Sequence, residues 1–332
     1  MATISDISNK AGVAKSTVSR YLNNGYVSER TKEKIEAAIK EFEYIPNSYA
    51  QSLRSESNRT VGVIIPRFDS YSVTTTLQGI DEELKRLNYN ILIENTNMNA
   101  KSEIEYLKRL AKLKVSGIIF LATNLSEEHI STIYLIDVPV IVIGQYAENL
   151  NCIIYKDYEA AYDLASQLAT YDFSEIAYLG VTEDDEAVGL LRKNGFIDRL
   201  KQGKHSRITT YYTDFSIESA KQKTAELLEE KQPELLICAT DNIAIGAMNA
   251  IHNKKLRIPE DISITGFGGH QISNYLSPSL TTIQYDYKHA GSIAAKNVVM
   301  LTGKEVQKKV IKIGYQIFMK ESVDKINFSL LD

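Results

Sequence analysis

Five of the six side chains in the segment Lys15–Arg20, "KSTVSR", can donate or accept hydrogen bonds. The guanidinium of Arg20 can donate two bonds to guanine, the hydroxyl of Ser16 can serve any base, and Lys15 offers a point charge. Residues 1–34 hold six Lys and Arg against three Asp and Glu, whereas the whole chain carries a net charge of -4. Any contact with nucleic acid is therefore expected to be local to this first segment.

A second group of polar side chains, "PRFDSYS" at residues 66–72, follows an apolar run at residues 61–65. Because ligands collect at the carboxyl ends of parallel strands, Arg67, Asp69 and Ser70 are candidate ligand contacts. The Arg67 guanidinium can fork onto phosphate oxygens, which it binds better than a neutral hydroxyl. A surface ion pair is an equally open interpretation of Arg67.

Other side chains suited to a sugar are spread along the chain. Tyr285 and Tyr287 alternate in "IQYDY", so they face the same way and can stack on a pyranose ring. Phe68 and Tyr71 can do likewise. Asp241 stands where a strand meets a helix start, and it either accepts sugar hydroxyls or caps that helix. The capping role is favoured.

Motifs for catalysis, metals and nucleotides do not stand out. The five histidines are scattered, and no GxSxG, HExxH or glycine-rich phosphate loop occurs at the expected places. His270, after "GFGG", can face a pocket, but a hydrogen-bonded position in a loop is favoured. Cys152 and Cys238 lie in apolar runs and are expected to be buried, reduced thiols. We therefore expect no enzyme activity, no metal and no cofactor.

Two kinds of structure must position these side chains, and the first is helical. Residues Thr3–Asp6 have the form of a capping box with Asp in place of Glu, and Gly12 ends the first helix. A second helix is expected at Lys15–Leu22, and a third after Ser28, running to about Glu43. The inward residues expected on the third helix are Ile35, Ala38, Ile39 and Phe42. Three helices with a tight turn between the first two form a helix-turn-helix arrangement.

The second kind of structure is an α/β core. After a marginal helix at about residues 46–54 and a polar linker, nine apolar runs alternate with amphipathic stretches from Thr60 onward. The strands are expected at residues 60–66, 89–95, 115–122, 139–144, 152–155, 175–181, 234–240, 262–268 and 281–287. Such alternation predicts parallel sheets covered by helices on both faces. Nine strands favour two sheets with a binding cleft between them.

The motifs resemble those of the lactose/galactose-repressor (LacI/GalR) family of bacterial transcription regulators. They include "ISDISNKAGVAKSTVSRYLNN", "VSERTKEKIEAAIKEFEYIPNSYAQSLR", "ATDNIAIGAMNAI", "IPEDISITGFG" and "SPSLTTIQYD". The resemblance implies a helix-turn-helix head with a hinge helix (residues 1–57), followed by a core like a type I periplasmic sugar-binding protein (58–332). Within that core, lobe 1 is expected at about residues 60–157 and 288–322, and lobe 2 at about 158–285.

For the head, the resemblance implies binding to a palindromic operator in double-stranded DNA. Lys15, Ser16 and Arg20 occupy the family's base-reading positions, while Thr17 and Ser19 suit phosphate contacts. The implied DNA-contacting set also contains Asn23, Ala50 and Leu53. In relatives, paired hinge helices of a dimer enter the minor groove, where a leucine at the position of Leu53 wedges between base pairs.

For the core, the resemblance implies a sugar effector. Arg192, in "GLLRKNGF", matches the family arginine that grips the sugar, and Arg67 with Asp69 and Ser70 resembles the repressors of trehalose type. Many sugar repressors have Asp where this chain has Gly144, followed by Gln145, and where it has Gly268. These departures favour a phosphorylated ligand. The chain most resembles sucrose-operon repressors of low-GC Gram-positive bacteria, so sucrose 6-phosphate is the first candidate.

The function expected from these observations is a homodimeric, cytoplasmic repressor of a sugar-utilisation operon, released from DNA by a sugar or sugar phosphate. An open alternative is a regulator that needs a corepressor, either a small ligand or a phosphocarrier protein. A sugar-processing enzyme is the remote alternative. The start of the chain is polar, and no apolar run approaches the roughly 18 residues that a membrane span needs, so no membrane partner is expected.

Overall fold

The computed structural model describes residues 2–22, 25–44, 59–171, 173–202, 207–302 and 309–324. The chain forms two compact units, Met1–Arg59 and Thr60–Asp332. The sequence places its boundary two residues earlier. The hinge segment expected at residues 46–54 lies outside the described residues.

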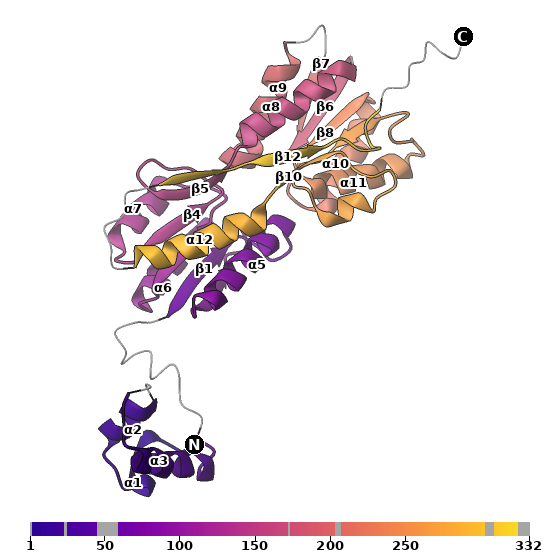
Figure 1. The fold of residues 1–332 in the computed structure, drawn as a ribbon. Coiled ribbons are helices and arrows are strands. Elements are labelled where there is room, and N and C mark those ends of the chain that lie inside the picture. Colours follow the sequence, from indigo (N-terminus) through magenta and orange to yellow (C-terminus); the bar gives the residue numbers. More distant parts are fainter. Residues whose placement is uncertain are drawn as a thin grey trace, which may run out of the picture. The chain divides into compact units, whose positions relative to one another are not determined.

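The first unit is a three-helix head with α1 at Ile4–Ala11, α2 at Lys15–Leu22 and α3 at Glu29–Glu41 (Figure 1). The expected capping box is confirmed, because the Thr3 side chain accepts a hydrogen bond from the backbone N–H of Asp6 and the Asp6 side chain accepts one from the backbone N–H of Thr3. Gly12 ends α1 at a φ of 65°. Helices this short need a shared core, which is formed mainly by the buried side chains Ile7, Ala11, Val18, Ile35 and Ala38.

The prediction that Phe42 faces the core of the head is wrong. Phe42 lies just beyond the end of α3 and remains 40% exposed. The reason is local, since α3 ends at Glu41 and the chain leaves the helix before a further turn can present Phe42 to the core.

The second unit contains a six-stranded parallel sheet in the order β11-β5-β4-β3-β1-β2. Its strands are β1 (Thr60–Ile65), β2 (Asn90–Asn95), β3 (Gly117–Leu121), β4 (Val140–Ile143), β5 (Asn151–Tyr155) and β11 (Val310–Ile313). Helices α5 (Tyr71–Arg86) and α12 (Tyr287–Leu301) cover one face, and α6 (Ala100–Lys112) and α7 (Glu127–Leu135) cover the other. The strands are therefore apolar on both faces, as a parallel sheet requires.

A second parallel sheet has the order β7-β6-β8-β9. Its strands are β6 (Glu175–Gly180), β7 (Arg207–Tyr212), β8 (Leu235–Cys238) and β9 (Ser263–Thr265). The helices of this lobe are α8 (Asp157–Leu168), α9 (Arg192–Leu200), α10 (Ile217–Glu230) and α11 (Asp241–Asn253). Short turns of helix lie at Ala169–Tyr171 (η1), Glu186–Leu191 (η2, a π-helix) and Gln271–Asn274 (η3).

A two-stranded antiparallel ribbon, β10 (Thr282–Tyr285) with β12 (Tyr315–Phe318), runs between the two sheets (Figure 1). After β12 the chain packs on the second lobe, where the backbone N–H of Ile264 donates to Ser322 and Val323 joins the core. The sequence places residues up to 322 in the first lobe, but residues 315–322 pack against the second. The pairing of β12 with β10 is the physical reason.

Helices α5 and α12 lie unusually close together. A Cβ at Gly79 of α5 would stand 1.9 Å from the carbonyl oxygen of Lys288, and a Cβ at Gly291 of α12 would stand 2.1 Å from that of Thr76. Only glycine allows this approach. The pair fixes the amino-terminal end of α5, which carries several of the polar side chains described next.

Candidate functional site

The exposed face of α2 carries the donors expected to meet DNA. Val18 points into the core, while Lys15, Ser16 and Arg20 are exposed and Thr17 and Ser19 are half-buried. Asn23, Ala50 and Leu53 lie outside the described residues. The structure thus places five of the eight expected DNA contacts on one short helix.

Two contacts hold α2 in its place. The hydroxyl of Tyr21 donates a hydrogen bond of 2.7 Å to Glu36 on α3, and this bond raises the pKa of Tyr21. The backbone N–H of Gly25 donates to the carbonyl of Arg20, and a Cβ at Gly25 would stand 2.5 Å from Cγ of Arg20. Gly25 therefore packs directly against Arg20.

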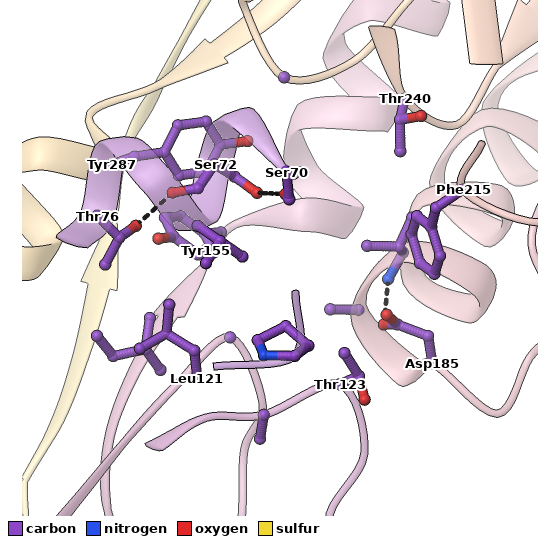
Figure 2. Close-up of a pocket in the computed structure, with 18 of the residues that line it drawn as sticks. Ser70, Ser72, Thr76, Leu121, Thr123, Tyr155, Asp185, Phe215, Thr240 and Tyr287 are labelled. Carbon is purple, nitrogen blue, oxygen red and sulfur yellow. Dashed lines mark hydrogen bonds between the residues drawn. The ribbon is translucent and has the colours of Figure 1, made fainter. Parts of the chain in front are cut away.

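A cleft lies where the two sheets of the second unit face each other, lined by residues from both lobes (Figure 2). Of the ten expected effector contacts, five line it: Arg67, Ser70, Gln145, Arg192 and Tyr287. The other five, Phe68, Asp69, Tyr71, Asp241 and Tyr285, are not part of the lining. Most lining residues follow the carboxyl ends of strands, which is where open α/β sheets bind ligands.

Arg67 stands in the loop between β1 and α5, where its ion pair with Asp69 is long and partly solvent-exposed. Its Nε lies 3.6 Å from Asp69, whose side chain is 80% exposed, and its Cζ lies 4.9 Å from the centre of the Phe215 ring. Burial lowers the pKa of the Arg67 guanidinium, although Asp69 and Asp214 oppose the shift. The hydroxyls of Ser70 and Ser72 lie 3.0 Å apart beside it. These donors at a helix amino terminus are compatible with an anion.

Arg192 is held rigidly on the opposite lobe. Its Nε donates to Asp157 at 2.8 Å, its Nη1 donates to the carbonyl of Ala239 at 2.8 Å, and its Cζ lies 4.0 Å from the centre of the Phe267 ring. Burial alone would lower the pKa of Arg192, but Asp157 raises it above its ordinary value. Tyr285 lies buried beneath the pair and donates to Asp157 at 3.4 Å. Tyr285 therefore supports the cleft rather than lining it.

Asp241 organises a loop. Its fully buried carboxylate accepts bonds from the His270 backbone N–H (2.6 Å), the Ser273 hydroxyl (3.0 Å) and the Thr282 hydroxyl (2.5 Å). The side chain that caps α11 is Thr240, which accepts from the N–H of Ile243. The favoured capping role of Asp241 is therefore wrong, because donors from the loop after β9, from η3 and from β10 occupy its oxygens.

Three contacts cross the cleft from the first lobe to the second. The side-chain nitrogen of Gln145 donates to Asp185 at 3.1 Å, the rings of Tyr71 and His270 lie 4.6 Å apart, and Arg67 stacks on Phe215. Burial raises the pKa of Asp185, which also caps η2 by accepting from the N–H of Val188. These contacts hold the two lobes together around the cleft.

Several lining residues are missing from the sequence interpretation. Figure 2 shows Tyr155, Asp185, Phe215 and Thr240 around the cleft, together with the hydroxyls of Ser72, Thr76 and Thr123. Asp185 and Phe215 follow the carboxyl ends of β6 and β7. The rule that found Arg67 therefore applies to Asp185 after the expected strand β6, and it would have found Phe215 had β7 been recognised. Gly144 and Gly268 do line the cleft, at φ angles of 97° and 138°. Although these two positions lack the family's carboxylates, the side chains of Asp157 and Asp185 bring two other carboxylates to the cleft, and both are hydrogen-bonded.

Within the described residues, no group of three or more His, Cys, Asp and Glu side chains is arranged to hold a metal ion. No helix among these described residues is both long enough and apolar enough to cross a membrane.

Comparison with known proteins gives two domain matches. Residues 3–47 match the profile of bacterial regulatory proteins of the lacI family, and residues 165–323 match a periplasmic binding protein-like domain. The sucrose operon repressor of Staphylococcus xylosus is 38% identical over 313 residues, which cover 94% of this chain and 97% of that protein. Catabolite control protein A of Priestia megaterium is 29% identical, over 96% of this chain and 98% of that protein.

Among solved structures, the lac repressor dimer bound to operator and the anti-inducer ONPF superposes with a TM-score of 0.86. It is 25% identical, and the match covers 97% of this chain and 98% of the other. The likeness therefore extends over the head and the core alike.

Proposed function

The chain belongs to the LacI family of bacterial regulatory proteins, and on this premise we propose that it represses a sugar-utilisation operon. In this proposal a homodimer binds a palindromic operator and leaves it when a phosphorylated disaccharide fills the cleft. Sucrose 6-phosphate is the first candidate effector. The protein acts in the cytoplasm, where bacterial DNA lies.

The head supports the DNA-binding part of the proposal. In a helix-turn-helix the second helix enters the major groove and presents its first residues to base edges. Helix α2 begins with the exposed residues Lys15 and Ser16, and Arg20 is exposed in its last turn. Arg20 then reads guanine, while Thr17 and Ser19 bind phosphates, and the positive charge of the head steers it to DNA.

The observation that carries the effector class is the position of Arg67. Its guanidinium lines the cleft beside the amino terminus of α5, and its nearest carboxylate, that of Asp69, stands 3.6 Å away and largely in solvent. Arg192, by contrast, is neutralised by Asp157. An anionic group therefore binds best at Arg67, while the sugar lies toward Arg192 and Tyr287. The similarity to a sucrose operon repressor supports sucrose as the sugar.

The contacts that cross the cleft suggest how binding is transmitted. A ligand that binds one arrangement of the lobes more tightly shifts the population toward it, by no more than its difference in affinity for the two arrangements. The dimeric lac repressor supports a dimer as the functional unit here. In the alternative, the bound partner strengthens operator binding instead of releasing the protein from DNA. That corepressor is either a small ligand or a phosphocarrier protein.

The test is a fluorescence titration of the full chain on a palindromic operator taken from beside its own gene, at fixed salt. It is repeated with sucrose, sucrose 6-phosphate and trehalose 6-phosphate. Release by one phosphorylated sugar, and not by sucrose, is the expected result. Tighter binding on adding a sugar phosphate would establish a corepressor instead. Tight binding that ignores all three sugars would contradict the proposed effector class.

A further inference from the structure

His270 lies in the loop after β9 and faces the cleft. Its backbone N–H is anchored on the buried carboxylate of Asp241, and its ring contacts the ring of Tyr71, 4.6 Å away on the opposite lobe. Neither ring nitrogen has a hydrogen-bond partner among the described residues of the chain. The sequence favours a hydrogen-bonded histidine in a loop. In the structure the backbone N–H of His270 is hydrogen-bonded, whereas its ring lines the cleft.

The groups around this ring come from four different elements. Arg67 from the loop after β1 is close enough to act on it electrostatically, and so is Asp241 at the start of α11. The ring of Tyr71 of α5 contacts it at an interplanar angle of 43°, and the hydroxyl of Tyr287 of α12 lies near Gly268, two residues before His270. The ring therefore shares the end of the cleft where Arg67 and the amino terminus of α5 lie.

We propose that His270 is an additional effector contact, which donates a ring hydrogen bond to the anionic group of the effector and takes up a proton as that group binds. This inference rests on the proposed function. It adds a second cationic ligand beside Arg67 and makes effector binding sensitive to pH. Because the ring also touches Tyr71, the same contact draws the two lobes together.

The electrostatics support proton uptake on binding. Burial lowers the pKa of His270, Asp241 raises it, and Arg67 lowers it further, so the net shift is downward. In the empty cleft the ring is therefore mostly neutral at pH 7. An anion placed between Arg67 and His270 offsets the charge of Arg67 and favours the protonated ring. Binding then becomes tighter as the pH falls toward the pKa of the free ring.

The test compares the full chain with its His270→Gln variant by calorimetry with sucrose 6-phosphate. Titrations at one pH in buffers of different ionisation enthalpy give the number of protons taken up. We expect wild type to take up more protons than the variant. The ratio of wild-type to variant affinity should also rise as the pH falls, by at most about tenfold per pH unit for a single proton. The phosphate's own titration is common to both proteins and cancels in the comparison.

The controls separate the ways in which the idea can fail. His252→Gln changes an exposed histidine of α11 outside the cleft and should behave as wild type. Equal proton uptake in wild type and in His270→Gln would overturn the role of His270 while leaving the proposed function intact. Failure of wild type to bind either sucrose 6-phosphate or trehalose 6-phosphate would overturn both. The melting temperature checks folding, and His270→Asn serves if the glutamine variant is unstable.

Discussion

Arg192 donates a hydrogen bond of 2.8 Å to Asp157, and both side chains are almost completely buried beside the ligand cleft. The two residues come from the starts of different helices, α9 and α8, which pack against each other in the second lobe. The carboxylate neutralises the guanidinium and fixes its orientation toward the cleft. Both the stability of the second lobe and the orientation of Arg192 in the cleft therefore depend on this ion pair.

Asp157→Asn is expected to destabilise the core, because it leaves the charge of Arg192 buried without a counter-ion. Breaking a buried pair in this way costs about 3–5 kcal/mol. The melting temperature of the full chain, followed by circular dichroism, should fall by several degrees. Lys254→Gln breaks the exposed pair with Glu229 and serves as the control, with almost no change expected. Equal melting temperatures for the two variants would contradict this account of the buried pair.

Gly79→Ala is expected to force α5 and α12 apart, because the new methyl group would meet the carbonyl of Lys288. Overpacking of this kind costs about 1–3 kcal/mol. The amino terminus of α5 should shift as well, so affinity for the effector falls together with stability. Gly314→Ala is the matched control, since a Cβ at Gly314 meets nothing within 4 Å. Thermal unfolding and effector titration of both variants test the idea, which a stable Gly79→Ala protein would contradict.

Much of the fold could be predicted because its signals are local. The nine apolar runs form strands β1 to β6 and β8 to β10. As expected, α1 begins after the capping box and ends at Gly12. The strands that escaped prediction are β7, β11 and β12. No residue of β7, "RITTYY", or of β12, "YQIF", is fully buried, so neither segment is a continuous apolar run, and β11 is a four-residue strand at the sheet edge. Pairing with distant partners, rather than composition, makes these segments strands.

The site was less predictable, because its partners are far apart in the sequence. Arg67 was found from a strand end and Gln145 from the family resemblance, but Asp185 and Phe215 approach them only once the two lobes face each other. Asp241 has the position of a cap, and nothing local reveals that Thr282 and Ser273 donate to it. A local pattern predicts which side chains a strand or helix presents, whereas the choice of partner depends on the tertiary fold.

Arg20→Ala is expected to abolish specific operator binding and to leave effector binding unchanged, because the head and the cleft lie in separate units. Each of the two heads of the proposed dimer loses a bidentate contact to a base, which costs about 1–3 kcal/mol per head, and loss of discrimination between operator and random DNA should follow. Lys40→Ala removes the same charge from α3 and should weaken binding to all DNA about equally. Footprinting and anisotropy titration test both. Retention of a full operator footprint by Arg20→Ala would contradict the assignment.

Asp185→Asn is expected to stabilise the core more at pH 8 than at pH 5. Burial raises the pKa of Asp185 in the folded chain above its value in the unfolded chain. Folding is therefore increasingly disfavoured by this group as the pH rises from the unfolded pKa toward the folded one. Asparagine keeps an oxygen for Val188 and Gln145 but carries no charge. Melting temperatures at the two pH values test this, with the exposed Asp137→Asn as control, and an equal gain at both would disprove it.

Arg67→Ala is expected to weaken the binding of sucrose 6-phosphate by about 10- to 100-fold, because hydrogen bonds to charged groups contribute about 1.5–3 kcal/mol. The affinity for sucrose should change much less, since the hydroxyls of a neutral sugar gain little from a guanidinium. Calorimetry with both ligands measures the difference, and Arg86→Ala, exposed at the carboxyl-terminal end of α5, provides the control. Equal losses for the two ligands would show that Arg67 only supports the loop through Phe215, and the anion would then have to bind elsewhere in the cleft.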